Sequence, residues 1–168
     1  MVLVPLVVYL LVRGKREEAL WLFALAGLSD ALDGFVARHF DQRTRLGAIL
    51  DPLADKLLIV ATALALAWLA LLPVWLAAIM VGRDLVILAG ALAYHFLIGP
   101  YQMAPSLPGK ICTFSQVVLV VGLLLHSAGY IDVSGYLRPA FVLVAVISVS
   151  SGAHYVWVWS HKAAKALT

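Results

Sequence analysis

The stretch that decides the fold lies at residues 30–55, which read DALDGFVARHFDQRTRLGAILDPLAD. Asp30 and Asp33 are three positions apart, and Asp51 and Asp55 are four positions apart. On an α-helix, either spacing puts both carboxylates on one face. Apolar sequence precedes the first pair and follows the second, and a short polar loop separates them. The stretch therefore predicts two antiparallel helices whose acidic faces converge near this loop.

The composition of the whole chain indicates a membrane protein. Of its 168 residues, 64% are hydrophobic and 12% are charged, and the mean hydropathy is +1.00. One soluble core could not enclose so much apolar surface. A helical crossing of a bilayer needs about 20 apolar residues. We therefore predict an all-α integral membrane protein, a bundle of about six transmembrane helices that forms a single membrane domain over residues 1–168.

Six apolar segments are the expected spans. They are Val2–Val12, Ala19–Ala37, Leu46–Leu72, Val74 to about Leu97, Ile111–Ala128 and Pro139–Ser160. The first segment is the shortest, so we expect a short or truncated first helix.

The charges favour lipid over nucleic acid as a partner. The net charge is +3 and the pI is near 9.2, but Lys and Arg are scattered among hydrophobic segments and form no basic face. Anionic lipid headgroups are the expected counter-charge. A modest excess of Lys and Arg places the loop between the acid pairs inside. We expect a multi-pass protein of the bacterial or mitochondrial inner membrane, with its active site facing the cytoplasm or the matrix.

Four carboxylates in membrane helices require compensation. Each costs about 2.5–3.5 kcal/mol at the centre of a bilayer, and converging like charges have to be neutralised by protons or cations. Carboxylate oxygens suit Mg²⁺ or Mn²⁺, whereas zinc favours His or Cys. We therefore predict a divalent metal site that holds one ion or two. Such a site serves displacement at a pyrophosphate, and the membrane location points to a lipid substrate.

Glycines and an arginine accompany the acids. Gly34 follows Asp33 directly and Gly47 lies four residues before Asp51, so a ligand could approach the backbone at both glycines. Arg38 could pair with a phosphate. Taken singly, the acids could be interfacial groups and the glycines could be helix-packing residues. Taken together in one short stretch, these residues favour a functional site.

The spacing of these residues resembles a known signature. The pattern Asp30-x2-Asp33-Gly34-x2-Ala37-Arg38-x8-Gly47-x3-Asp51-x3-Asp55 is similar, at every fixed position, to that of the CDP-alcohol phosphotransferase family. The resemblance implies a six-helix membrane enzyme, usually a homodimer, whose acids hold two divalent cations on the cytoplasmic side.

The resemblance also implies a role for each residue of the pattern. The metal ligands would be four aspartates: Asp30, Asp33, Asp51 and Asp55. Of these, Asp55 would also be the general base that takes a proton from the acceptor hydroxyl. The pocket for the CDP moiety of the donor would be shaped by Gly34, Ala37, Arg38 and Gly47, with Arg38 against the phosphates.

The wider sequence resembles one branch of this family. The run Asp51-Pro-Leu-Ala-Asp-Lys-Leu-Leu58 is similar to that of the phosphatidylglycerophosphate synthases and the eukaryotic-type cardiolipin synthases, which implies CDP-diacylglycerol as the donor. The fourth span reads Gly82-Arg83-Asp84-Leu85, and the Ser-Gly-Leu-Arg stretch associated with the former group is missing after it. This favours phosphatidylglycerol as the acceptor, with glycerol 3-phosphate as the alternative.

Two basic residues outside the signature, Arg83 and Lys110, could either bind the acceptor or have a structural role. Arg83 is a candidate contact for the acceptor phosphate or a member of a structural ion pair. Because Arg83 and Asp84 are neighbours in sequence and do not share a helical face, we expect each to have a partner elsewhere. Lys110 is a candidate acceptor contact or a positive-inside anchor.

Two other kinds of protein could carry intramembrane acids. A cation-coupled transporter or channel also uses them, but it needs acids along a route, whereas these cluster at one depth. An inactive scaffold could keep the fold, but a protein that loses activity commonly loses at least one of its catalytic acids as well. All four acids are present in this chain. The sequence therefore favours the enzyme.

Overall fold

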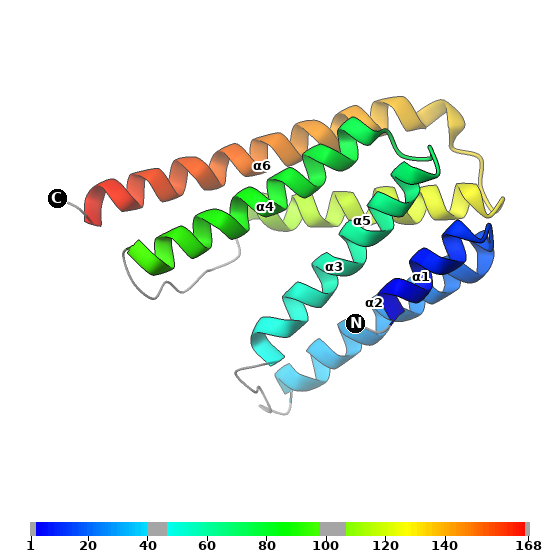
Figure 1. The fold of residues 1–168 in the computed structure, drawn as a ribbon, viewed down its shortest axis with the longest axis horizontal. Helices are drawn as coiled ribbons and strands as arrows, with labels where there is room; N and C mark the ends of the chain where they lie inside the picture. Colours follow the sequence, from blue (N-terminus) through cyan, green and yellow to red (C-terminus); the bar gives the residue numbers. More distant parts are fainter. Residues whose placement is uncertain (1–2, 40–46, 98–106, 167–168) are drawn as a thin grey trace. The chain divides into compact units, whose positions relative to one another are not determined.

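A computed structural model describes residues 3–39, 47–97 and 107–166 (Figure 1). Within these ranges, side chains are described except at positions 30–31, 33–39, 47–55, 91–97, 159 and 162–166. The elements are α1 (Leu3–Val12), α2 (Arg16–His39), α3 (Gly47–Trp68), α4 (Val74–Leu97), α5 (Leu107–Ser127), the 3₁₀ turn η1 (Ser134–Tyr136) and α6 (Leu137–Ala166). The described ranges contain no strand. The predicted all-α fold with six helices is confirmed.

Proline and glycine set several helix boundaries. Pro73 directly precedes α4, which begins at the predicted Val74. Gly14 and Gly129 follow α1 and α5 with φ values of 75° and 84°, a left-handed conformation that glycine adopts without steric cost.

Three predicted helix starts were too late. The second helix begins at Arg16 and not at Ala19. The fifth helix begins at Leu107 and not at Ile111, and the sixth begins at Leu137 and not at Pro139. In the fifth and sixth helices a proline, Pro108 or Pro139, lies in the first turn. A proline is tolerated there because its missing N–H has no partner within the helix.

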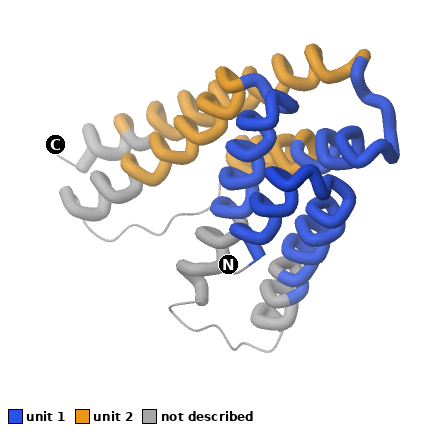
Figure 2. The backbone as a smooth tube through the Cα atoms, turned by 45° about the vertical axis from the view of Figure 1, so that its right-hand side comes forward, with its two compact units in different colours: residues 1–73, 120–134 blue, residues 74–119, 135–168 orange. Residues whose placement is uncertain are grey.

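The described chain forms two compact units (Figure 2). Unit 1 consists of residues 1–73 and 120–134, and in it α1 packs against α2 and α3 while α2 contacts α3. Its buried apolar side chains include Val7, Leu11, Phe23, Leu66 and Leu124.

Two contacts in unit 1 join the start of α2 to the end of α5. Arg16 Nη1 donates to the carbonyl of Ser127 at 3.3 Å, and the Tyr130 hydroxyl donates to the Glu17 carboxylate. The connection between α1 and α2 therefore lies against the connection between α5 and α6.

Unit 2 consists of residues 74–119 and 135–168. Here α4 packs along α6, as Figure 1 shows, and the first part of α5 contacts α6 through polar side chains. The buried apolar side chains include Leu76, Met80, Leu119, Phe141 and Val144. The prediction of one domain over residues 1–168 is not tested by this division and stays a prediction.

Two helical segments of the described chain are long and apolar enough to cross a membrane. They are Leu107–Ser127 and Ser134–Val158. Both expose large apolar side chains, among them Phe114 at 70% and Trp157 at 63%. Shorter apolar helical segments occur at Leu3–Val12 and Lys56–Trp68.

Candidate active site

The two acid pairs lie on contacting helices. Asp30 and Asp33 fall in the second half of α2, and Asp51 and Asp55 fall in the first half of α3. The two helices run in opposite directions and contact each other (Figure 1). Both pairs therefore lie toward the end of the helix pair where residues 40–46 connect α2 to α3.

The remaining residues of the signature share these two helices. Gly34, Ala37 and Arg38 belong to α2, and Gly47 is the first residue of α3. The side chains of all eight signature residues lie outside those that the structure describes, so their predicted convergence stays a prediction.

The metal prediction also depends on these side chains. Among the side chains that the structure describes, no group of three or more His, Cys, Asp or Glu could hold a metal ion. The four aspartates are not in that set. Their donor chemistry fits the predicted ions, because four carboxylates supply only the hard oxygen ligands that Mg²⁺ and Mn²⁺ prefer.

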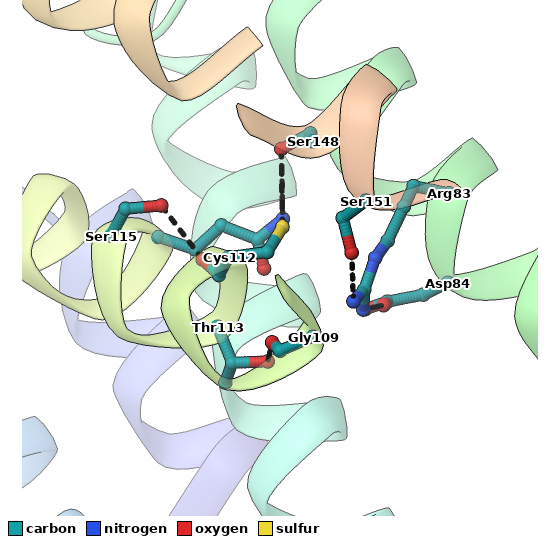
Figure 3. Close-up of polar contacts among 9 residues, drawn as sticks. Arg83, Asp84, Gly109, Cys112, Thr113, Ser115, Ser148 and Ser151 are labelled. Atoms are coloured by element: carbon teal, nitrogen blue, oxygen red, sulfur yellow. Dashed lines mark hydrogen bonds and ion pairs between the residues drawn. The ribbon is translucent and has the colours of Figure 1, made fainter. Parts of the chain in front are cut away.

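Arg83 lies in a buried polar cluster of unit 2 (Figure 3). Only 7% of the residue is exposed, and Nη1 donates to Asp84 Oδ1 at 2.7 Å while Nη2 donates to Ser151 Oγ at 2.9 Å. The guanidinium carbon lies 5.9 Å from the centre of the Tyr155 ring. Gly152 adjoins this cluster, since a Cβ at Gly152 would lie 3.6 Å from Arg83 Cγ.

The ion pair between Arg83 and Asp84 is a contact that the sequence did not predict. Arg83 and Asp84 were expected to find partners elsewhere, yet they form an ion pair with each other. The flexible arginine side chain bridges the angle between adjacent helical positions. The expected partner elsewhere is confirmed for Arg83, because it also bonds Ser151 on another helix.

A second polar cluster joins α5 to α6 in unit 2. Gln116 Nε2 donates to Ser148 Oγ at 3.3 Å, and Cys112 Sγ lies 3.5 Å from the same oxygen. All three residues are at least 98% buried. Sequence analysis missed these partners. The available signal was Ser148-x2-Ser151, two hydroxyls on one face of an apolar helix.

Lys110 lies near the start of α5 and is exposed. Arg83 and Lys110 both belong to unit 2, whereas the four aspartates belong to unit 1. A common site for these two groups stays a prediction.

Comparison with known proteins decides the family. Residues 1–158 match the family model described as CDP-alcohol phosphatidyltransferase. The chain belongs to this family. The fixed residues of its signature occupy α2 and α3, the two contacting helices that carry the acids.

Named relatives of the chain fall into two groups. It is 35% identical to a human cardiolipin synthase (CMP-forming), over 91% of this chain and 56% of the relative. It is 37% identical to a cardiolipin synthase (CMP-forming) of Streptomyces coelicolor, over 75% of this chain and 60% of the relative. It is 35% identical to a CDP-diacylglycerol–glycerol-3-phosphate 3-phosphatidyltransferase of Escherichia coli, over 92% of this chain and 87% of the relative.

The chain thus spans little more than half the length of the human and Streptomyces relatives. It spans most of the Escherichia coli relative. Identity alone does not separate the two groups.

Proposed function

We propose that this protein transfers a phosphatidyl group from CDP-diacylglycerol to an alcohol acceptor and releases CMP. One observation carries the proposal: the complete family signature lies toward the connected end of two contacting helices. The match to the CDP-alcohol phosphatidyltransferase family over residues 1–158 supports it.

The proposed reaction is a direct displacement at phosphorus. Asp55 accepts the proton of the acceptor hydroxyl as that oxygen attacks the donor phosphorus nearest the diacylglycerol. The bond between this phosphorus and the CMP oxygen breaks, and CMP leaves. Arg38 holds the phosphates of the CDP moiety, and Gly34, Ala37 and Gly47 leave room for it. Two divalent ions, Mg²⁺ or Mn²⁺, held by the four aspartates would neutralise charge on the phosphate oxygens.

Phosphatidylglycerol is the proposed acceptor, which would make the protein a cardiolipin synthase. The motif Gly82-Arg83-Asp84-Leu85, without a following Ser-Gly-Leu-Arg stretch, supports this choice. Glycerol 3-phosphate is the alternative, supported by the similarity to the Escherichia coli relative. Arg83 and Lys110 are the proposed acceptor contacts.

The proposed setting is an inner membrane, with the acids on the cytoplasmic or matrix side and two copies of the chain in a homodimer. Six crossings would place the connection between α1 and α2 on the same side as the connection between α5 and α6. The bonds from Arg16 to Ser127 and from Tyr130 to Glu17 join these two connections. This contact supports the topology.

The test is CMP release by the purified protein in lipid, given CDP-diacylglycerol and either Mg²⁺ or Mn²⁺. Phosphatidylglycerol and glycerol 3-phosphate are offered separately. We expect metal-dependent release with phosphatidylglycerol, and Asp55→Asn should lower kcat at least about 100-fold because it removes the base. Glu18→Gln is the matched control, since Glu18 is an exposed acid that pairs with Lys15 outside the signature.

The outcomes separate the alternatives. Release with glycerol 3-phosphate alone would change the acceptor but keep the reaction. Absence of metal-dependent release with either acceptor, from folded protein, would contradict the proposal and favour the transporter, which would then be tested by cation flux into vesicles.

A further inference from the structure

Two buried serines of α6 hold the neighbouring helices of unit 2. Ser148 and Ser151 are three positions apart, so they lie on one face of α6. Ser148 accepts a hydrogen bond from the α5 side chain Gln116. Ser151 accepts one from the α4 side chain Arg83 (Figure 3). The serines are 0% and 1% exposed. One turn of α6 therefore contacts both helices that carry the proposed acceptor contacts.

These bonds fix how far each helix can slide along α6. A shift of one residue moves a helix about 1.5 Å along its axis, whereas hydrogen-bond lengths vary by only a few tenths of an ångström. Such a shift would break the Ser148 and Ser151 bonds and leave buried polar groups without partners.

The serines thereby fix the positions of the two cations. Arg83 itself is bonded to Ser151 at 2.9 Å. Lys110 lies two residues before Cys112, whose Sγ is 3.5 Å from Ser148 Oγ, so the position of Ser148 determines where the first turns of α5 place Lys110. A misplacement of about 1 Å at a reacting site can cost up to about 100-fold in rate.

We propose that Ser148 and Ser151 are positioning residues that fix the register of α5 and α4 on α6 and so place Lys110 and Arg83 for the acceptor. The inference rests on the proposed function. It adds two residues outside the signature and a role in acceptor recognition, not in binding of the CDP moiety.

The test compares Ser148→Ala and Ser151→Ala with Ser150→Ala. Ser150 lies between them but is exposed, and its hydroxyl donates to carbonyls of its own helix, at Val146 and Ile147. We expect the KM for the acceptor to rise about 3- to 20-fold in each of the first two variants, the range that one intramembrane hydrogen bond supports. The KM for CDP-diacylglycerol should stay within about twofold of wild type. Ser150→Ala should match wild type in both.

A double variant separates positioning from stability. Ser148→Ala alone leaves the buried Gln116 amide without its bond to Ser148, so it should also lower Tm. Ser148→Ala/Gln116→Leu removes both polar groups and should recover Tm, but the acceptor KM should stay high because the register is no longer fixed. The proposal would be overturned, and the role shown to be purely structural, if the double variant recovered both Tm and the acceptor KM. Equal rises in the KM values for the acceptor and for CDP-diacylglycerol would have the same meaning.

A second readout needs no turnover. Binding of the acceptor to the folded protein raises Tm, so the shift caused by phosphatidylglycerol or by glycerol 3-phosphate reports acceptor binding directly. We expect the shift in wild type and Ser150→Ala and a smaller one in Ser148→Ala and Ser151→Ala. A wild type that binds but releases no CMP would contradict the proposed function alone, whereas equal shifts in all variants, or none in wild type, would overturn this inference.

Discussion

At the scale of the residue, Arg83 shows how a charge can be kept in apolar surroundings. Its charge is balanced by the neighbouring Asp84, whose side chain is 16% exposed, and one further donor is satisfied by Ser151. Its Nε has no hydrogen-bond partner among the described residues. A buried ion pair contributes little net stability, but removal of one partner leaves an uncompensated charge.

Arg83→Met should therefore destabilise the protein. We expect a loss of about 3 kcal/mol in the free energy of unfolding, because the part-buried ion pair with Asp84 is lost and the buried Ser151 hydroxyl loses its donor. Arg138→Met is the matched control, because Arg138 also lies in unit 2 but is exposed. Its free energy of unfolding should stay within about 0.5 kcal/mol of wild type. Reversible unfolding in detergent measures both, and equal losses would contradict the explanation.

At the scale of the element, the end of α3 holds a residue in an unfavourable conformation. Ala70 has a φ of 57°, a left-handed conformation that disfavours side chains with a Cβ. Its N–H donates to the carbonyl of Ala67 at 3.1 Å, so the conformation belongs to the turn that ends α3 before Pro73. Pairing the last turn in this way satisfies a carbonyl that the helix end would otherwise leave without a partner.

Ala70→Gly should stabilise the protein by about 0.5–1 kcal/mol, since glycine adopts this conformation without steric cost. The same substitution at Ala61, inside α3, should destabilise it by a similar amount because it adds only chain entropy to the unfolded state. Tm values of the two variants test the prediction, and shifts of the same sign would contradict it.

The contact between Tyr130 and Glu17 predicts a dependence on pH. Its hydrogen bond to Glu17 raises the pKa of Tyr130 above the ordinary value of 10.0. The neutral phenol makes this bond, so its contribution is fully present below about pH 10 and is lost as the pH rises through the higher folded-state pKa. The pKa of Tyr130 is measured by titrating tyrosinate absorbance and subtracting the curve of the Tyr130→Phe variant. Glu17→Gln should lower this pKa. An unchanged pKa would contradict the assignment.

The helices were predictable because their signals are local. Runs of apolar residues, Pro73 and the polar loops are visible in the sequence, and α4 has the predicted bounds. The starts of α5 and α6 were missed because Pro108 and Pro139 were not recognised as residues of a first helical turn.

The candidate site was predictable only where spacing defines it. The signature residues are close in sequence, so helical periodicity relates them to one another. The bonds from Ser148 to Gln116 and from Ser151 to Arg83 join residues that are 32 and 68 positions apart. Such pairs depend on how the helices pack, and no local pattern encodes that.

At the scale of the whole molecule, the apolar surface is the dominant property. Large hydrophobic side chains are exposed on every α-helix among the described residues, including Leu28, Leu57 and Leu88. A water-soluble monomer rarely exposes large contiguous apolar patches. The proposed membrane setting would cover this surface with lipid, and it also predicts which connections face the same side.

The burial of Cys112 makes that topology open to direct chemical mapping. It is the one cysteine of the sequence, it is 0% exposed, and its sulfur lies among the side chains of Ser148 and Gln116. A maleimide that cannot cross membranes should therefore leave the wild-type protein unlabelled, so no cysteine has to be removed before a new one is introduced. With the acids inside, Asp132→Cys should be labelled on intact cells and Ser160→Cys only after permeabilisation. The reverse pattern would invert the proposed orientation.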